Sequence, residues 1–262
     1  MTYEQTPRHA PPPAMSDGHF DVEEAKDLQT TDSDMLGVNT ATRAMPAASD
    51  AQISRAVDFR LYLITDRTQT CGRPLVAAVQ AAAHAGVKAL QLREKDLAPR
   101  ELYNLAGELL TVLAPYRAQL LINDRADIAQ TLPAAGVHLT TTSLTPLVAR
   151  RCLPPGALIG VSTHTLTEAR FAETEGADFL TFGPVFATPA KLAYGEPLGL
   201  EALRQVCAAV TIPVFALGGI TPERAAACRA AGAHGVAAIS ALLHVLDIPA
   251  AVAAFAEALG GL

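Results

Sequence analysis

The sequence predicts a (β/α)8 barrel, an α/β fold of the TIM-barrel type, and three observations support this prediction. From residue 59 onward, short apolar runs alternate with Ala-rich segments that can each bury one helical face. There are eight such runs, and the seven steps from residue 60 to residue 235 average 25 residues. Eight parallel strands at this spacing fit a closed barrel better than an open doubly wound sheet, which is the structural alternative.

The expected strands and helices alternate along the whole of this region. The strands are expected at 60–65, 87–93, 119–123, 136–139, 158–162, 178–182, 212–217 and 235–239. The helices are expected at 74–85, 98–114, 125–133, 145–152, 166–175, 199–210, 222–231 and 248–259. Because each strand is followed by a helix, we expect residues 59–262 to form a single domain.

Residues 1–58 differ from the rest of the chain in composition and charge. They are rich in Pro, Ser, Thr, Asp and Ala, and their four basic and ten acidic residues account for the whole net charge of −6. Such a segment buries too little apolar surface to offset its ordering entropy, so we expect a disordered acidic extension without catalytic consequence. A short helix within 47–57 and a functional tail are the alternatives. The remaining 16 basic and 16 acidic residues balance, which argues against nucleic-acid binding through a general basic field.

The cysteines and the N-terminal residues indicate the cellular compartment in which we expect the protein. Cys71, Cys152, Cys207 and Cys228 form no CxxC pair, which argues against a disulfide framework and a structural zinc site. The first residues lack the apolar run and basic start of a secretory signal, and no run approaches the ~18 apolar residues of a membrane span. We therefore expect a cytoplasmic protein with no membrane partner.

Polar residues follow nearly every expected strand, at positions that line one mouth of such a barrel. They are Thr65 to Arg67, Gln91, Arg93 to Lys95, Asn123 to Arg125, His138, Thr140, Ser162, His164, Thr188, Lys191, Gly218, Gly219 and Ser240. Arg93 and Lys95 can point to the same side, one as a bidentate fork and the other as a point charge. Lys191 lies in a loop long enough to cover the mouth. The residues after the last two strands are where backbone amides often hold a monophosphate. The sequence therefore predicts two anionic groups in one pocket.

Each of these features also has a simpler interpretation. The charges at 93–96 could be a solvated run, and the glycine pair could be a tight turn. Asp124 could cap the following helix, and His138 is interpreted as a satisfied core histidine because Val137 and Leu139 flank it. Because these polar residues all lie at the same end of the eight expected strands, we favour the interpretation that they bind anionic groups.

An ordered set of motifs carries a family resemblance over residues 60–248. The motifs are LYLITD at 61–66, QLREK at 91–95, INDR at 122–125, GVHL at 136–139, GVSTH at 160–164, GPVF at 183–186 with Thr188 and Lys191, ALGGIT at 216–221 and Ile239-Ser240. The chain resembles the thiamine phosphate synthases and their relatives, the thiazole tautomerases of the TenI type.

The synthase resemblance implies an alkyl transfer. The synthase joins 4-amino-2-methyl-5-pyrimidinylmethyl diphosphate to thiazole phosphate; the diphosphate leaves first, and the thiazole nitrogen captures the pyrimidine cation. By resemblance, the residues that bind the pyrimidine diphosphate are Gln91, Arg93, Lys95, Asn123 and Lys191, with Ser162 near the pyrimidine. Those that bind the thiazole phosphate are Thr188, Gly218, Gly219, Ile239 and Ser240, while Asp124 holds Mg²⁺. Lys191, Ser162 and His164 are the expected catalytic residues.

Two positions depart from the synthase pattern. Ser143 stands where the family has a second metal-binding aspartate, and Ala190 stands where its lid usually has a threonine. Both changes favour the tautomerase, a proton transfer on a thiazole carboxylate phosphate for which His164 is the acid/base candidate. The intact motifs at 91–95 and 122–125 favour the synthase, and a diverged, non-catalytic protein that binds thiazole phosphate is the third possibility.

Overall fold

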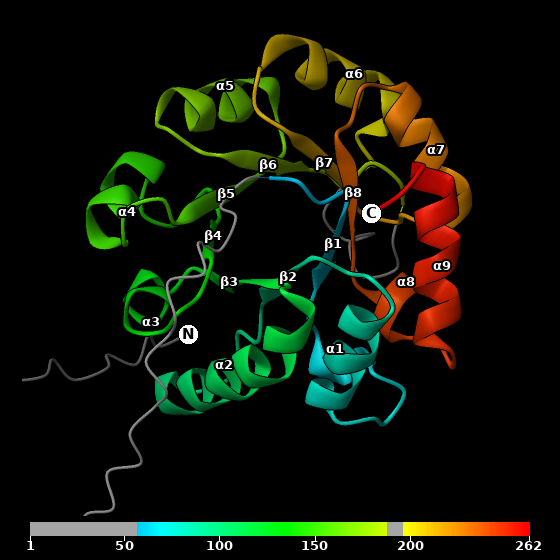
Figure 1. Cartoon of the computed structure of the whole chain (residues 1–262). Coiled ribbons are helices and arrows are strands. Elements are labelled where there is room, and N and C mark those ends of the chain that lie inside the picture. Colours follow the sequence, from blue (N-terminus) through cyan, green and yellow to red (C-terminus); the bar gives the residue numbers. More distant parts are fainter. Residues whose placement is uncertain (1–56, 188–195) are drawn as a thin grey trace, which may run out of the picture. The chain divides into compact units, whose positions relative to one another are not determined.

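The computed structural model describes residues 57–187 and 196–262, and it shows a closed barrel of eight parallel strands. The strands pair in chain order, and β8 pairs with β1 to close the ring (Figure 1). Their bounds are β1 Leu61–Ile64, β2 Ala89–Leu92, β3 Gln119–Asn123, β4 Gly136–Leu139, β5 Leu158–Thr163, β6 Phe179–Phe182, β7 Val214–Leu217 and β8 Gly235–Ala238. The closed (β/α)8 barrel is confirmed, and the open sheet is not observed.

The helices surround the barrel (Figure 1). Their bounds are α1 Leu75–His84, α2 Pro99–Leu113, α3 Ala126–Thr131, α4 Pro146–Cys152, α5 Leu166–Thr174, α6 Gly199–Ala209, α7 Pro222–Ala230, α8 Ser240–Leu243 and α9 Ile248–Leu259. All eight expected helices are present, with α8 as an additional short helix. Two 3₁₀ turns, η1 Arg67–Gln69 and η2 Ala114–Tyr116, were not expected from the periodicity.

Apolar residues form one core inside the barrel and another between barrel and helices. Alternation along β1 sends Tyr62 and Ile64 inward and leaves Leu61 and Leu63 in the outer core. The inner core is aromatic: the ring of Phe59 lies 5.0 Å from that of Phe215, and both rings pack around Phe179. These rings fill the barrel interior, so any small-molecule site must lie nearer an open end.

The expected extension falls almost entirely outside the residues that the structure describes. Of residues 1–58, Val57 and Asp58 are described, and they lead directly into the barrel. The prediction of a disordered acidic tail therefore stays a prediction. Within 57–187 and 196–262, no helix combines the length and the apolar character needed to cross a bilayer.

Candidate active site

The parallel barrel brings most of the predicted site residues to one end. Gln91 lies near the end of β2, Asn123 ends β3, Ser162 lies near the end of β5, and the others follow their strands directly. Arg93, Lys95, Asp124, His164, Gly218, Gly219, Ile239 and Ser240 make up this second group. The structure thus gathers these residues at the C-terminal mouth, where (β/α)8 barrels carry their active sites. Thr188 and Lys191 lie outside the described residues.

A buried polar cluster lies in the barrel beneath this mouth. Nε2 of His138 is 3.0 Å from Oγ of Ser162 and 3.4 Å from Oγ1 of Thr181, and its Nδ1 is 3.4 Å from the Tyr62 hydroxyl. His138 is 1% exposed, so its interpretation as a satisfied core histidine is confirmed. The same ring also contacts Ser162, a predicted site residue, and thereby links the core to the mouth.

His138 is neutral because it is buried and lies near a cation. Burial, with the charge of Arg93 as a second cause, lowers the pKa of His138 to about 3. The missing side chain at Gly160 makes room for the ring, because a Cβ there would lie 2.5 Å from Nδ1. A neutral imidazole carries one N–H donor and one acceptor nitrogen, so it can bond Ser162 without adding charge.

Gln91 leaves an unsatisfied donor within this cluster. Its side chain is 2% exposed, and Nε2 has no hydrogen-bond partner among the described residues. The amide lies close enough to oppose slightly the rise that burial causes in the pKa of Tyr62, but the contact lacks the geometry of a hydrogen bond. A buried donor without a partner costs roughly 1–3 kcal/mol, so an acceptor atom on a ligand would relieve that cost.

Arg93 presents an uncommitted positive charge at the mouth. Its backbone N–H donates to Oγ1 of Thr65 at 2.9 Å, which fixes the start of the loop. Within the described parts of the chain, the guanidinium forms no ion pair and no hydrogen bond, although it contributes to lowering the pKa of Asp66 and of His138. The side chain of Lys95 is likewise unpaired within 57–187 and 196–262. Two such cations at one mouth suit an anionic ligand.

The neighbouring residue Glu94 has a different role from these cations. Its side chain is 3% exposed, and it accepts hydrogen bonds from the backbone N–H and Nη1 of Arg67, each at 3.2 Å. Arg67 also pairs with Asp96, so the loop after β2 is tied to the turn after β1. The simpler interpretation of 93–96 as a solvated charge run is therefore wrong for Glu94, which is buried, whereas Lys95 and Asp96 are exposed.

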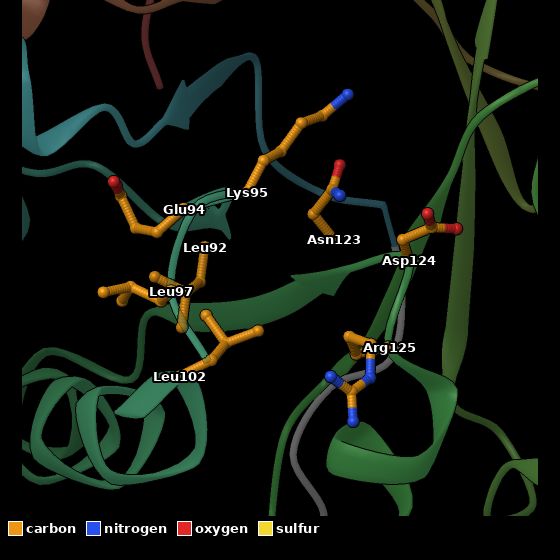
Figure 2. A pocket seen from close by; sticks show the side chains of 8 residues that line it. All are labelled: Leu92, Glu94, Lys95, Leu97, Leu102, Asn123, Asp124 and Arg125. Carbon is orange, nitrogen blue, oxygen red and sulfur yellow. The ribbon is translucent and has the colours of Figure 1, made fainter. Parts of the chain in front are cut away.

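A pocket of about 260 Å³ opens between the loops that follow β2 and β3. Figure 2 shows Leu92, Leu97 and Leu102 together on one side, with the polar side chains of Asn123 and Asp124 across from them. The remaining lining residues are Glu94, Lys95 and Arg125. The pocket thus combines an apolar wall with groups that suit phosphate and a hard cation.

Asp124 offers one free carboxylate at the edge of this pocket. Its backbone is left-handed, with φ at 66°, and its N–H donates to the carbonyl of His138 at 2.9 Å. In the described parts of the chain, the carboxylate accepts no hydrogen bond, so the predicted alternative of a helix cap is wrong: α3 has no side-chain cap. A free, exposed carboxylate is a suitable ligand for Mg²⁺.

The Ser143 hydroxyl forms hydrogen bonds within its own turn. Its Oγ accepts a hydrogen bond from the backbone N–H of Thr140 at 2.8 Å and lies 2.9 Å from the Thr140 hydroxyl. Among the described residues, no group of three His, Cys, Asp or Glu side chains could hold a metal ion. The residues present therefore fit Mg²⁺ as an ion carried by one carboxylate together with substrate oxygens and water.

His164 follows β5 and contacts the end of β6. Its Nδ1 donates to the carbonyl of Gly183 at 2.5 Å, and its backbone N–H donates to the Glu168 carboxylate at 2.6 Å. A donor Nδ1 leaves Nε2 of the neutral ring as the acceptor nitrogen. The side chain is exposed, so this nitrogen can meet a ligand.

The glycine pair after β7 is required by close packing. A Cβ on Gly218 would lie 2.5 Å from Pro184, and one on Gly219 would lie 2.7 Å from the carbonyl oxygen of Ala187. Both glycines have positive φ, at 96° and 63°. Arg224 holds this contact from α7, because Nη1 donates to the Gly219 carbonyl at 2.6 Å and the guanidinium lies 4.8 Å from the Phe186 ring centre. The pair is more than a tight turn, since it seats the segment that precedes Thr188.

Sequence reasoning missed Tyr62 and Thr181 as supports of the site, and it placed Glu94 at the mouth without recognising that Glu94 holds the loop after β2. Strand alternation could have identified the first two, because Tyr62 shares the inward face of β1 with Ile64 and Thr181 pairs in register with Ser162. Nothing in the local sequence distinguishes Glu94 from the exposed charges beside it.

The fold and the mouth together define the class of protein: a (β/α)8 barrel whose C-terminal end presents Arg93 and Lys95, two cations without side-chain partners among the described residues. Within that class, the chain belongs to the thiamine monophosphate synthase family, whose model matches residues 61–242. It is 51% identical over 187 residues to a putative thiamine-phosphate synthase of Geobacter sulfurreducens, a match that covers 71% of this chain and 88% of that protein.

Two further comparisons agree with this family. The thiamine-phosphate synthase of Moorella thermoacetica is 44% identical over 191 residues, covering 73% of this chain and 91% of the relative. The solved structure of a thiamine phosphate pyrophosphorylase from Pyrococcus furiosus is 35% identical, with a TM-score of 0.70 over 77% of this chain and 96% of that one. The resemblance that the sequence motifs carry is therefore confirmed.

Proposed function

We propose that this protein is a thiamine phosphate synthase, a transferase of thiamine biosynthesis. Its substrates would be the small molecules 4-amino-2-methyl-5-pyrimidinylmethyl diphosphate and thiazole phosphate, and its products thiamine phosphate and diphosphate. The observation that carries the proposal is that Arg93 and Lys95 at the mouth have no side-chain partner among residues 57–187 and 196–262, in a chain 44–51% identical to proteins named as synthases. The cytoplasmic setting expected from the sequence belongs to the same proposal.

The arrangement of charges supports a reaction in which a diphosphate departs. Arg93 and Lys95 would bind the diphosphate and stabilise the charge that grows on it as the bond to the pyrimidine methylene carbon breaks. The thiazole nitrogen then bonds to that carbon, so the reaction requires binding and orientation more than a strong base. This agrees with the neutral state of His138, whose pKa of about 3 makes it a poor base and leaves it to hold Ser162.

Asp124 would hold Mg²⁺ together with the diphosphate oxygens. The ion would supply positive charge that offsets the charge of the leaving diphosphate. Asp124 suits this role because its carboxylate is exposed at the pocket edge, whereas Ser143 is bonded to its own turn. We therefore propose that the metal binds mainly as a complex with the diphosphate, since Asp124 is the carboxylate of the described pocket lining that is not already bonded to an arginine, as Glu94 is.

The test is a direct assay of the full chain with both substrates and millimolar Mg²⁺. Thiamine phosphate and diphosphate should form in equal amounts. Absence of product under these conditions would refute the synthase proposal.

The thiazole tautomerase is the second candidate, and the geometry of His164 and Ser143 favours it. Among the described residues, the acceptor nitrogen Nε2 of His164 has no hydrogen-bond partner, so it could take part in proton transfer, and Ser143 stands in place of the second metal carboxylate. This proposal predicts isomerisation of the thiazole carboxylate phosphate without metal, and loss of that rate in His164→Ala. Tight binding of thiazole phosphate with neither turnover would instead identify the non-catalytic paralogue.

A further inference from the structure

Arg73 joins two loops that lie far apart in the sequence. It follows the turn after β1, and its side chain reaches the residues that end α8 and lead into α9. Nε donates to the carbonyl of Thr70 at 3.0 Å, Nη1 to that of Leu246 at 3.0 Å and Nη2 to that of Leu243 at 3.1 Å. Nη2 also donates to the carbonyl of Val245. We call this set of bonds the Arg73 clasp.

The clasp is itself held in a fixed conformation. Thr70 is 2% exposed, and its hydroxyl donates to the Arg73 carbonyl at 2.6 Å. The clasp also spans the closure of the barrel, where β1 pairs with β8. The acceptors of the clasp are all carbonyl oxygens, so no carboxylate offsets the positive guanidinium, which lies at the C-terminal end of α8, where a cation is favourable.

The clasp acts on a helix that is only one turn long. The carbonyl of Leu243 belongs to the last residue of α8, and Ser240 is the first. Four residues at a rise of about 1.5 Å each span about 6 Å, so a shift at the clasped end must move Ser240 as well. Figure 1 shows α8 beside α9, at the same part of the barrel as α1.

We propose that Arg73 is a positioning residue for the thiazole phosphate. It would act through α8, by holding Ile239 and Ser240 where the substrate phosphate docks. This inference rests on the proposed function, because the position of the thiazole phosphate beside Ile239 and Ser240 is part of that proposal. Arg73 would not bind the phosphate itself, because its donors are committed to carbonyl oxygens, whereas Arg93 is unpaired within the described residues.

The test compares Arg73→Met and Arg73→Lys with a matched control. Arg229 forms a similar arrangement at the opposite end of β8, where Nη1 donates to the carbonyls of Ala233 and His234, each at 2.6 Å. Arg229→Met therefore also removes a guanidinium that bonds backbone carbonyls, but these carbonyls precede β8 and lie away from the mouth. For each full-length variant, steady-state assays measure kcat and the KM for each of the two substrates. Calorimetry measures the affinity for thiazole phosphate in the absence of the other substrate.

Arg73→Met should raise the KM for thiazole phosphate about tenfold, equivalent to 1.4 kcal/mol of binding. The KM for the pyrimidine diphosphate and kcat at saturation should change less than about twofold, and Arg73→Lys should recover part of the affinity because it restores a donor. Arg229→Met should lower the thermal midpoint and leave both KM values unchanged. Equal changes in both KM values, or the same thiazole-specific loss in Arg229→Met, would overturn the proposal.

Calorimetry keeps this inference separate from the proposed function. If the wild-type chain forms no thiamine phosphate, the synthase proposal fails, yet binding of thiazole phosphate can still be compared between the wild type and the two Arg73 variants. Unchanged affinity in Arg73→Met would then refute the positioning role. If Arg73→Met does not fold, wild-type affinity in a folded Arg73→Lys would refute the need for the guanidinium, and a weakened affinity would support it.

Discussion

At the scale of single residues, His138 connects the stability of the barrel to the geometry of its mouth. The ring contacts Tyr62 below and Ser162 above, and both contacts require the imidazole to stay in the interior. Ionisation would place an unpaired charge among aromatic rings, which explains why burial is the main cause of its low pKa. The same burial that orients Ser162 should therefore make the fold sensitive to acid.

We predict that His138 contributes a specific acid sensitivity to folding. Its pKa is about 3 when folded and 6.5 when unfolded, so between these pH values the unfolded state binds the extra proton. Stability is then lost as the pH falls below 6.5, by up to about 1.4 kcal/mol for each pH unit, and the loss levels off near pH 3.

Denaturant unfolding at pH 7 and pH 4.5 measures this loss. His138→Gln keeps an amide near Ser162 but does not titrate, so the free energy of unfolding of this variant should fall by about 2.5 kcal/mol less than that of the wild type over this interval. Parallel losses in the wild type and the variant would show that His138 is not the source.

Ser143 is the residue whose replacement should change metal binding. Ser143→Asp restores a carboxylate near the mouth, and aspartate can still accept the hydrogen bond from the Thr140 N–H. We expect Mn²⁺, used as a spectroscopic substitute for Mg²⁺, to bind about tenfold more tightly in the presence of diphosphate.

Electron paramagnetic resonance of free Mn²⁺ measures this affinity without any turnover. Ser143→Ala is the control, because it removes the hydroxyl without adding charge and should leave the affinity unchanged. An unchanged affinity in Ser143→Asp would mean that residue 143 does not face the ion.

At the scale of elements, the mouth is built from contacts between successive loops. Glu94 ties the loop after β2 to η1, and His164 ties the end of β5 to the end of β6. The pair Gly218 and Gly219 seats the segment after β6 against the end of β7. These contacts make the positions of the site residues interdependent, so a change in one loop should affect its neighbour.

We predict that Gly218→Ala is far more damaging than Gly176→Ala. The two glycines have similar φ, 96° and 89°, so both alanines pay the strain of a left-handed backbone, about 1–2 kcal/mol. A Cβ at residue 218 would also lie 2.5 Å from Pro184, whereas a Cβ at residue 176 would meet nothing within 4 Å. Overpacking should add roughly 1–3 kcal/mol at residue 218. Urea unfolding of both variants tests this prediction. Equal decreases in the free energy of unfolding would mean that the backbone at Pro184 shifts to accommodate the added Cβ without a measurable cost.

At the scale of the whole molecule, the alternation of apolar runs and Ala-rich segments was sufficient to predict the barrel. Each strand run was found because buried parallel strands are continuously apolar, and the errors were a few residues at the ends. The site was predicted where polar residues end those runs, as at Arg93 and Asp124. The supporting contacts could not be predicted from local sequence. The carbonyls of Leu243, Val245 and Leu246 that Arg73 bonds lie 170 to 173 residues away, and His138 meets Ser162 through the register of β4 with β5.

We predict that removing residues 1–56 leaves catalysis unchanged. The described site residues, and the barrel that carries them, lie within 57–262. The shortened chain should keep kcat/KM within about twofold and its thermal midpoint within a few degrees, while its isoelectric point rises because the removed residues carry most of the acidic excess. Steady-state assays and calorimetry of the shortened and full chains test this, and a large fall in kcat/KM would reveal a functional tail.

The pairing of β1 with β8 has a consequence for how the protein is made. Leu61 and Val236 are register partners, so β1 can pair with β8 only after nearly the whole chain has been synthesised. During translation from the N-terminus, the growing chain must therefore carry an open strand edge until the last βα unit has left the ribosome. The Arg73 clasp forms only after that point, so the proposed thiazole phosphate site would be completed among the last events of folding.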